Sequence, residues 1–426
     1  MLLVVMLFGM AAALLVYGMV DTTSLAAQRD RVTAAALAQA KQALIGRAVT
    51  DDTRPGSLPC PDFDDGQINA INVANDGVAD VMAGNVCPSY IGRLPWKTLG
   101  LPDLRDDAGE RLWYALSNVF RDDMAAGPLN SDTQGNRIVY DGSTAVTVTA
   151  QAVAVIFAPG GILPGQIRDG TAAACSTNAT PPTIARNLCA ANYLDAAGGA
   201  NNAQAGGAGP FIIAQRSDTF NDRLLVISTA ELIPPVEQRV ARELRQILQD
   251  YKSRTACTCT TPLGTTGCYP WADLSNGYSD SDPYNAGEGR NRGRIPALGA
   301  GPYDWGSNPC GTALPTLPAW FINNDWRLVV HYAAGRNFLG PGACTTCTDP
   351  TLTVTGDPSP SKEVLILMPG PNLGASPRAP VPTNDGTYWQ YYFEDPANQV
   401  DVASGDDVYI VPTSTAYARD RIYTIP

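Results

Sequence analysis

The ten cysteines are the side chains whose chemistry is easiest to read from this sequence. Their even number and loop-like surroundings favour disulfides formed in an oxidising compartment. Cys60–Cys87 would close an aspartate-rich loop, and Cys175–Cys189 would close a loop of small residues. A c-type haem is excluded, because its attachment needs Cys-x-x-Cys-His and the single histidine, His331, lies apart from every cysteine pair.

The other six cysteines leave their pairing open. An internal duplication, described below, aligns Cys268 and Cys310 with the first pair and predicts a bridge between them. Two further bridges are expected among the last four cysteines, Cys257, Cys259, Cys344 and Cys347. The last two also have the Cys-x-x-Cys spacing of zinc sites, but zinc would need two more ligands, and the compartment favours a disulfide.

A second chemical feature is the cluster of side-chain oxygens in "PDFDDGQINAINVANDGVAD". Oxygen ligands at alternating positions suit calcium, and the predicted ligands are Asp62, Asp64, Asp65 and Asp76, with Asn75 and Asp80 in the same loop. The sequence lacks the bidentate glutamate of an EF-hand, and Asp, Asn and Gly also form plain turns. A weaker cluster, "DLSNGYSDSD", repeats the pattern with Asp273, Asn276, Asp280 and Asp282. No other cofactor is suggested.

Catalytic motifs are missing from the sequence. It has one histidine, no Gly-x-Ser-x-Gly nucleophile elbow and no His-Glu-x-x-His zinc pair. No pair of carboxylates stands out as the catalytic couple of a glycoside hydrolase. We therefore expect no enzymatic activity. The net charge of −12 also argues against nucleic-acid binding, because a phosphate backbone needs a basic face.

The elements that hold these residues follow from composition and pattern. A chain of 426 residues allows two or three domains. The 40 glycines and 34 prolines favour many turns and short strands over a helical bundle. The segments "AVAVIFA" and "EVLILM" are typical of central strands, and "DRLLVIS" and "DRIYTI" are typical of their neighbours.

One series of motifs occurs twice in the same order. The first copy has "GRLPWKTLGLP", "RLWYALS", "AVAVIFAPGG", "NYLDAAGGANN" and "FNDRLLVIS"; the second has "GRIPALG", "WRLVVHYAAG", "KEVLILMPGP", "YYFEDPANQ" and "ARDRIYTIP". In each copy a helix precedes a mostly antiparallel sheet and would cover its apolar face. The predicted fold is α+β: a long N-terminal helix (1–49), a first β-rich head module (50–230) and a second module (231–426), linked by disulfides.

Both covering helices show an apolar stripe. In the first it is formed by Leu37, Ala40, Leu44 and Ala48. In the second, expected over 235–254 with Pro234 and Pro235 marking its start, it is formed by Val240, Leu244, Ile247, Leu248 and Tyr251. The boundary between the modules is expected near Thr229–Pro235.

The first helix begins with twenty uncharged residues, "MLLVVMLFGMAAALLVYGMV". As a helix they would be about 30 Å long, the thickness of a bilayer core. A secretory signal would show basic residues before the apolar run; we expect that a basic leader has been removed and that Met1 is the mature terminus. The residues expected in a membrane or a filament core include Met1, Leu2, Leu3, Val4, Val5, Met6, Leu7, Phe8, Leu14, Leu15 and Val16.

A naked apolar helix that becomes amphipathic and leads into a sheet resembles the type IV pilins and type II secretion pseudopilins. The stretches "RPGSLPCPDFDDG" and "GRLPWKTLGLPDLRDDAGERLWYALS" look like a group of pilin-like proteins with large heads. Two positions depart from the family. Most major pilins have Glu where Val5 stands, and many have Pro where Thr22 stands, which puts a major-subunit role in doubt.

The resemblance implies a non-enzymatic structural role. Such a subunit waits in the inner membrane, is processed by a prepilin peptidase, and is then assembled by pilus or secretion machinery into an extracellular filament at the cell surface. Its partners would be copies of itself or other pilins, packed through the apolar helix. Similar pseudopilins often bind calcium in their heads.

Two alternatives stay open. A minor subunit that initiates or caps a pilus or a secretion pseudopilus fits Val5 and the large head. A single-span periplasmic binding or adhesive protein that never polymerises would use its aromatic-rich C-terminal module as a binding face.

Overall fold

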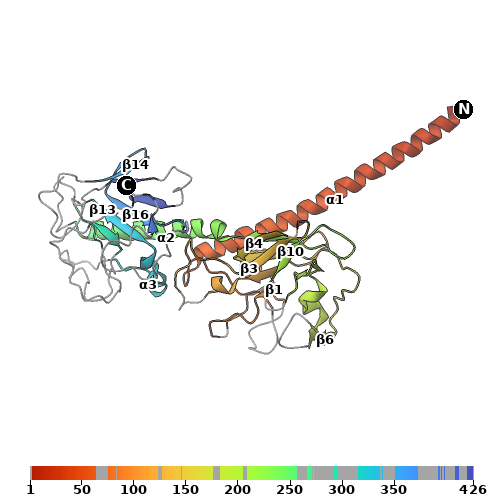
Figure 1. The fold of residues 1–426 in the computed structure, drawn as a ribbon, viewed down its shortest axis with the longest axis horizontal. Helices are drawn as coiled ribbons and strands as arrows, with labels where there is room; N and C mark the ends of the chain where they lie inside the picture. The colour runs from red at the N-terminus through yellow and green to blue at the C-terminus, as the bar shows by residue number, and fades with distance from the viewer. Residues whose placement is uncertain are drawn as a thin grey trace. The chain divides into compact units, whose positions relative to one another are not determined.

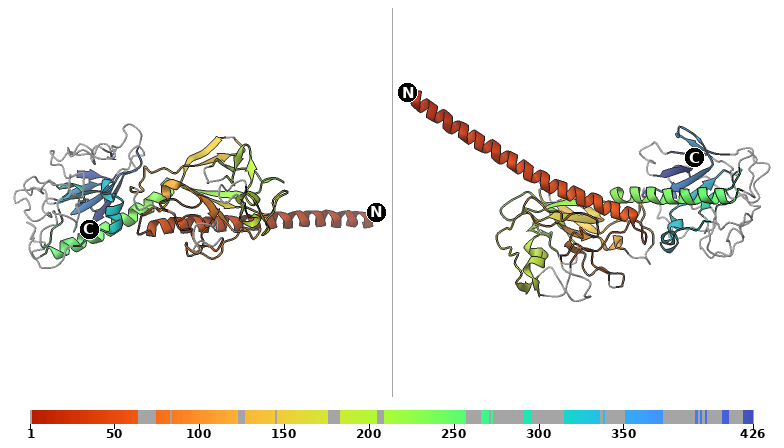
Figure 2. Two further views of the ribbon diagram at one scale, coloured as in Figure 1. Left: turned by 90° about the horizontal axis from the view of Figure 1, so that it is seen from below. Right: turned by 180° about the vertical axis from the view of Figure 1, so that it is seen from behind.

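The computed structural model describes residues 2–63, 75–82, 84–122, 127–144, 146–175, 183–204, 209–256, 266–270, 272, 291–295, 315–335, 338, 351–372, 392–393, 395, 398, 408–411 and 420–425, with the backbone alone over 2–24 (Figures 1 and 2). The chain folds as two compact units. Unit 1 contains residues 1–50, 57–123 and 134–232; unit 2 contains residues 51–56, 124–133 and 233–426. Two short segments from the predicted first module, 51–56 and 124–133, thus belong to unit 2.

Unit 1 begins with helix α1, Leu2–Thr50, a single element of 49 residues. Its C-terminal part packs on the unit's sheet, where it contacts β5 and β11. The predicted stripe is confirmed, because Leu37, Ala40, Leu44 and Ala48 are all buried. Their spacing of three and four residues aligns them along one face of the helix, so burial of this face fixes α1 on the sheet.

The main sheet of unit 1 has four strands in the order β1 (Ile91–Arg93), β2 (Trp113–Leu116), β5 (Ala154–Ala158) and β11 (Arg223–Ile227). Every neighbouring pair is antiparallel. The prediction of "AVAVIFA" as a central strand, with "DRLLVIS" beside it, is confirmed. All five residues of β5 are buried, as expected of a strand covered on both faces.

A second sheet in unit 1 was not predicted. Its order is β10 (Phe211–Ile213), β3 (Arg137–Asp141) and β4 (Val146–Ala152). β3 pairs with β4 antiparallel and with β10 parallel. Phe157 and Phe211 meet edge to face at 5.0 Å between centroids, and both belong to the core cluster that joins the two sheets. Two small hairpins complete the unit: β6 (Ala172–Ala174) with β7 (Thr183–Ala185), and β8 (Ala196–Ala197) with β9 (Ala200–Asn201).

Helix α2, Thr229–Arg254, begins earlier than predicted. Pro234 and Pro235 lie inside it and do not mark its first turn. The true start is a capping box: Glu231 Oε2 accepts from the backbone N–H of Ser228 (3.1 Å) and from its hydroxyl (2.9 Å). Four of the five residues of the predicted stripe are buried, and Ile247 is half-buried.

Unit 2 contains a four-stranded sheet in the order β12 (Arg292–Arg294), β13 (His331–Ala334), β16 (Val364–Met368) and β18 (Arg421–Ile425), again antiparallel throughout. α2 lies alongside this sheet (Figures 1 and 2). A three-stranded sheet follows the order β15 (Ser361–Lys362), β14 (Leu352–Thr355) and β17 (Val408–Ile410). The short helix α3 spans Ala319–Asn323. The predicted central strand "EVLILM" and its neighbour "DRIYTI" are confirmed. The molecule is α+β with an N-terminal helix and antiparallel sheets.

Candidate functional site: the exposed part of the first helix and the acidic loop

The exposed part of α1, Leu25–Val32, touches little else in the molecule. All eight of its residues are exposed, on every side of the helix. Leu25 is 53% exposed and Val32 is 47% exposed, although both side chains are large and apolar. Figures 1 and 2 show the helix running on past the sheets of unit 1. The exposed part is therefore a stretch of helix that extends beyond the sheets of unit 1 and exposes apolar side chains to water.

Within the described part of the chain, no helix combines the length and the apolar character that crossing a membrane requires. Of the predicted span, residues 1–20, the structure describes the backbone alone from Leu2 on, and this includes the predicted core residues from Leu2 to Val16. Met1 lies outside the described residues.

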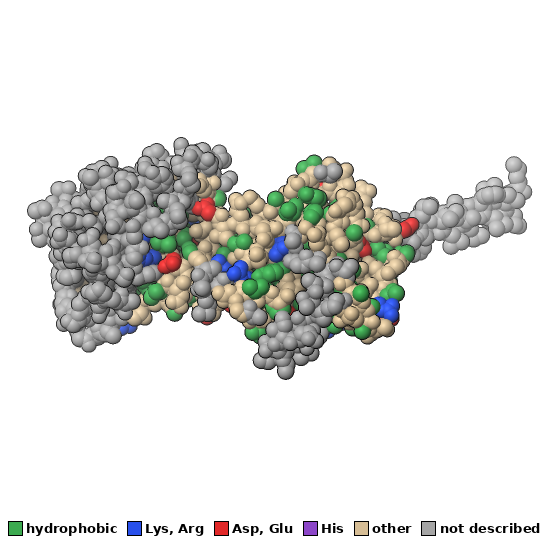
Figure 3. All heavy atoms as spheres, turned by 60° about the horizontal axis from the view of Figure 1, so that its bottom comes forward, with side chains coloured by type: hydrophobic (Ala, Val, Ile, Leu, Met, Phe, Trp, Pro, Cys, Tyr) green, Lys and Arg blue, Asp and Glu red, His purple; other side chains and the backbone are tan. Residues whose placement is uncertain are grey.

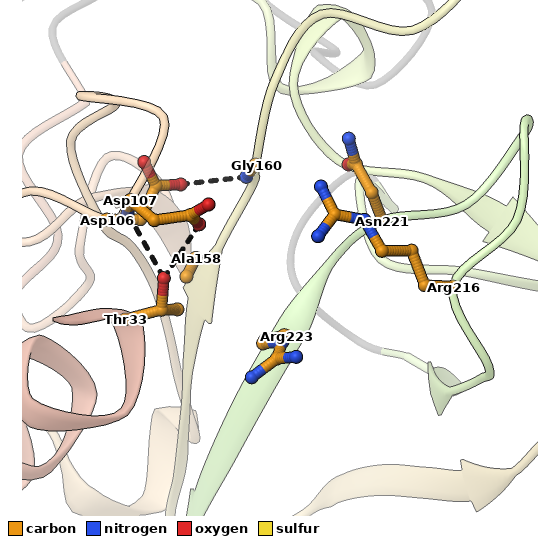
Figure 4. A pocket seen from close by; sticks show the side chains of 8 residues that line it. All are labelled: Thr33, Asp106, Asp107, Ala158, Gly160, Arg216, Asn221 and Arg223. Atoms are coloured by element: carbon orange, nitrogen blue, oxygen red, sulfur yellow. Dashed lines mark hydrogen bonds between the residues drawn. The ribbon is translucent and has the colours of Figure 1, made fainter. Parts of the chain in front are cut away.

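The point where α1 meets the rest of unit 1 is fixed by side-chain hydrogen bonds (Figure 4). Thr33 Oγ1 donates to Asp107 Oδ1 (2.8 Å) and accepts from the Asp107 backbone N–H (3.1 Å). Arg223 forms an ion pair with Asp30 at 2.6 Å. Lys41, about two turns further into the packed part, donates to Val226 O at 2.9 Å. The packed part thus begins at Thr33, directly after Val32.

A small cavity lies beside this junction (Figure 4). It is lined by Thr33, Asp106, Asp107, Ala158, Gly160, Arg216, Asn221 and Arg223. Its volume is about 10 Å³, no more than one water molecule needs. Asp106 is occupied in binding the backbone: its carboxylate accepts from the N–H groups of Ala108 (2.9 Å), Glu110 (2.9 Å) and Gly160 (2.8 Å). This cavity is too small for an organic substrate.

The acidic loop is organised by Asp62. One carboxylate oxygen accepts from the Asn75 N–H (2.8 Å) and the other accepts from the Gly77 N–H (2.7 Å). The backbone of Asp62 pairs with Arg93, at 2.7 and 3.0 Å. Gly92 permits this approach, because a Cβ there would lie 2.7 Å from Asp62 O. Asp62 therefore holds the two ends of the loop together through its backbone partners.

The predicted calcium ligands are only partly described. Asp64 and Asp65 lie outside the described residues, and Asp76 Oδ1 accepts from the Val78 N–H at 2.7 Å. Among the described residues, no group of three or more Asp, Glu, His or Cys side chains is placed to hold a metal ion. The second predicted cluster, Asp273 to Asp282, also lies outside the described residues.

Asp62 predicts a pH dependence of stability. Burial raises the pKa of its carboxyl from 3.8 to about 6, so the folded chain holds this proton more tightly than the unfolded chain does. The stabilisation is complete below about pH 4 and is lost as the pH rises through about 6. As the pH rises from about 4 to about 6, we expect the free energy of unfolding of the wild type to fall relative to that of Asp62→Asn, because asparagine does not titrate. Urea unfolding of both proteins measures the difference; a difference that is flat with pH would contradict the prediction.

Two predicted disulfides are confirmed, Cys60–Cys87 and Cys175–Cys189, with Cα–Cα distances of 5.6 and 5.7 Å. Cys268 is disulfide-bonded as well. Its predicted partner Cys310 lies outside the described residues, and so do the four cysteines whose pairing was left open. The Cys60–Cys87 bridge closes the acidic loop, as expected.

Two clusters of buried polar side chains in unit 1 were not predicted from the sequence. The first is a carboxylate pair: Asp222 Oδ2 accepts from the Asp195 N–H (2.7 Å), and Asp195 Oδ2 accepts from the Asn221 N–H (2.7 Å). Burial raises the pKa of both carboxyls. Because the two residues are distant in sequence, and because Asp is common in turns, no local signal marks them.

The second buried cluster is a stack of arginine guanidinium groups and aromatic rings. The Arg93 guanidinium lies 4.2 Å from the Trp113 ring centroid and 4.0 Å from that of Tyr193. Arg168 lies 4.4 Å from the Tyr193 centroid and pairs with Glu110 at 2.9 Å. Burial lowers the pKa of Arg93 to about 10. Such cation–π contacts stabilise buried arginines, so the stack holds the core of unit 1.

His331 is a core residue of unit 2. It is fully buried, and its ring lies 5.1 Å from that of Tyr392 and 4.9 Å from that of Phe393, between centroids. Its Nδ1 lies 3.2 Å from Val329 O. The side chain packs in the aromatic core.

Comparison of this chain with models of known protein families, with curated proteins and with solved structures found no match.

Proposed function

We propose that this chain is a structural subunit of an extracellular pilin-like filament that assembles through α1. The observation that carries the proposal is the exposed part of α1, where a continuous helix leaves the sheet with Leu25 and Val32 in water. Upstream of it the sequence has twenty residues without charge. Apolar surface of this kind is stable only when lipid or other protein covers it.

Copies of the same helix would serve as that cover. In a bundle of such helices, each uncharged segment packs against its neighbours, and Leu25 and Val32 continue the contact toward the head. The resemblance to pilins described above supports this arrangement. Before assembly, the same segment would lie in the inner membrane.

A charge in the exposed part of α1 tests the proposal. We expect Leu25→Asp to lower the yield of filaments by tenfold or more, because a carboxylate would be buried without a partner in the bundle. The thermal midpoint of the heads should change little, since Leu25 is 53% exposed and its side chain contributes little to the packed core. Ile162→Asp is the matched control, because Ile162 is 61% exposed in a loop of the same unit.

The measurement is made on fibres sheared from cells that produce each variant, by cryo-electron microscopy and mass spectrometry. Normal filaments from Leu25→Asp would reject assembly through α1. If wild-type fibres contain the chain only in traces, the chain is a minor or tip subunit. If the chain stays in the membrane fraction and no fibre contains it, the chain is a membrane-anchored binding or adhesive protein.

We also infer that the two units arose by internal duplication. The supporting observation is that their sheets have corresponding strand orders, β1–β2–β5–β11 with β10–β3–β4, and β12–β13–β16–β18 with β17–β14–β15. In both units the three-stranded sheet combines one parallel and one antiparallel pair.

Two side-chain contacts also recur. In unit 1, Asn202 exchanges hydrogen bonds with the backbone of Ile212 (2.7 and 3.2 Å); in unit 2, Asn398 does the same with Ile410 (3.0 and 3.1 Å). The hydroxyl of Tyr114 donates to Pro59 O (3.3 Å), and that of Tyr332 donates to Pro270 O (2.8 Å). Recurrence of contacts that topology alone does not require favours a common origin over coincidence.

A further inference from the structure

Two buried carboxyl groups of unit 1, those of Asp195 and Asp222, face each other. Asp195 directly precedes β8 and Asp222 directly precedes β11, and the two residues are only 5% and 6% exposed. A hydrogen bond joins their side chains. Two carboxylates at such a contact repel each other strongly when both are ionised, and a single proton between them would remove the repulsion.

The hydrogen-bond donors around the two carboxyl groups are distributed unevenly. Gln166 Nε2 donates to one oxygen of Asp195 at 2.8 Å. The N–H groups of Asn221 and Asp222 donate to the other oxygen, at 2.7 and 3.2 Å. Asp222 Oδ2 accepts from the Asp195 N–H (2.7 Å) and from Asn202 Nδ2 (2.9 Å). Asp222 Oδ1 is buried as well, but no donor among the described residues reaches it. An ionised Asp222 would therefore leave one buried oxygen without a hydrogen bond, which is costly.

We propose that Asp195 and Asp222 share one proton, carried by Asp222 Oδ1, and that their hydrogen bond is a pH-sensitive latch within unit 1. Asp222 donates this proton to the Asp195 carboxylate, which keeps its charge and its three other donors. Burial and the neighbouring charge of Asp195 both raise the pKa of Asp222, in agreement with this assignment. Loss of the proton would place two negative charges side by side in a buried site, so the latch would separate.

The charged groups around the latch agree with a proton on Asp222. Burial is the larger influence on Asp195 and raises the pKa of its carboxyl, but the positive charge of Arg168 acts in the opposite direction. Arg168 is itself held by an ion pair with Glu110 at 2.9 Å. Arg223, the first residue of β11, pairs with Asp30 at 2.6 Å. The cation on the Asp195 side thus favours a negative charge there and leaves the proton to the other member of the pair.

The latch connects peripheral segments of unit 1 to its main sheet. Asp222 leads into β11 of that sheet, and Asp195 leads into the β8–β9 hairpin. Gln166 belongs to the loop that follows β5. Asn202 extends the network to β10, because it exchanges two hydrogen bonds with the backbone of Ile212, at 2.7 and 3.2 Å. Separation of the latch should loosen the hairpin and this loop first. The device acts within one copy, so its test does not depend on whether the chain forms filaments.

The latch predicts that a rising pH weakens unit 1. The unfolded chain releases the proton at the ordinary carboxyl pKa of about 4, whereas the folded chain retains it. The stabilisation is therefore complete below about pH 4 and is lost as the pH rises through the raised pKa of Asp222. Within that window, this proton alone raises the unfolding equilibrium constant by up to tenfold per pH unit. Asp222→Asn should abolish this contribution, because its amide can donate to Asp195 as the acid does but does not titrate.

Urea unfolding of the full-length chain in detergent, from about pH 5 to about pH 9, measures the difference. Asp218→Asn is the matched control, because Asp218 is exposed in the turn before the same strand, and it should follow the wild type at every pH. On the face drawn in Figure 3, the visible Asp and Glu side chains lie at the surface. They titrate alike in the wild type and in Asp222→Asn, so their contribution cancels. Parallel stability curves for these two proteins would overturn the proposal.

The position of the proton has a test of its own. Asp195→Asn should raise the unfolding equilibrium constant at least tenfold at every pH, because its NH2 group would face donors that need an acceptor. Equal stability of Asp195→Asn and Asp222→Asn, or the opposite order, would overturn the assignment. Infrared spectroscopy at about pH 6 should show the C=O stretch of a protonated carboxyl in the wild type that Asp222→Asn lacks. A wild type without this band would overturn the proposal even if neither variant folds.

Discussion

Arg421→Met is expected to lower the free energy of unfolding of unit 2 by about 3–5 kcal/mol. Arg421 forms an ion pair with Glu237, whose side chain is fully buried in helix α2. Glu237 Oε1 has no hydrogen-bond partner among the described residues, so the arginine is the main compensation for this charge. Removing it leaves a carboxylate buried without a counter-ion, which costs far more than losing an exposed ion pair.

The matched control is Arg254→Met. Arg254 pairs with Asp250 at 2.9 Å on the exposed side of the same helix, and its loss should change the free energy of unfolding by less than about 1 kcal/mol. Hydrogen exchange of peptides from α2, followed by mass spectrometry, reports on unit 2 separately. The double variant Glu237→Met with Arg421→Met should recover most of the loss. If it is as unstable as Arg421→Met alone, the stranded charge is not the cause.

Leu44→Ala is expected to destabilise unit 1 by about 2–5 kcal/mol, because it leaves a cavity between α1 and the sheet. Leu44 is fully buried, whereas Leu25 on the same helix is 53% exposed. Leu25→Ala removes the same atoms and should change the free energy of unfolding by no more than about 0.5 kcal/mol. Urea unfolding of the three proteins measures both changes. Similar effects at the two positions would mean that α1 does not pack as described.

Patterns within single elements were predictable from the sequence. The stripe Leu37, Ala40, Leu44 and Ala48 identified the packed face of α1, because helical spacing directly encodes which residues share a face. The central strands β5 and β16 were also predicted from local pattern, because each is a short apolar run bounded by Pro and Gly. Two cysteine pairs were predicted because each closes a local loop.

Elements that depend on distant partners were not predictable. β3 pairs in parallel with β10 from far along the chain. β4, "VTVTAQA", alternates apolar and polar residues, but only Ala152 among them is buried, so the pattern does not correspond to a core face. The start of α2 was predicted at Pro234 and Pro235, which fit a first helical turn, whereas the helix begins earlier, at the Ser228–Glu231 capping box. The buried Asp195–Asp222 pair of unit 1 forms only when the fold brings two turns together.

In the proposed filament, the continuity of α1 would couple the folding of the head to assembly. Eight exposed residues are too few to form a stable helix in water, because starting a helix is costly and each further residue adds little. The part of α1 that packs on the sheet supplies the nucleus, and the exposed part extends it. A chain whose head is unfolded would have no such nucleus and no rigid helix to offer. Correct folding would thus act as a form of quality control, exercised before any two copies meet.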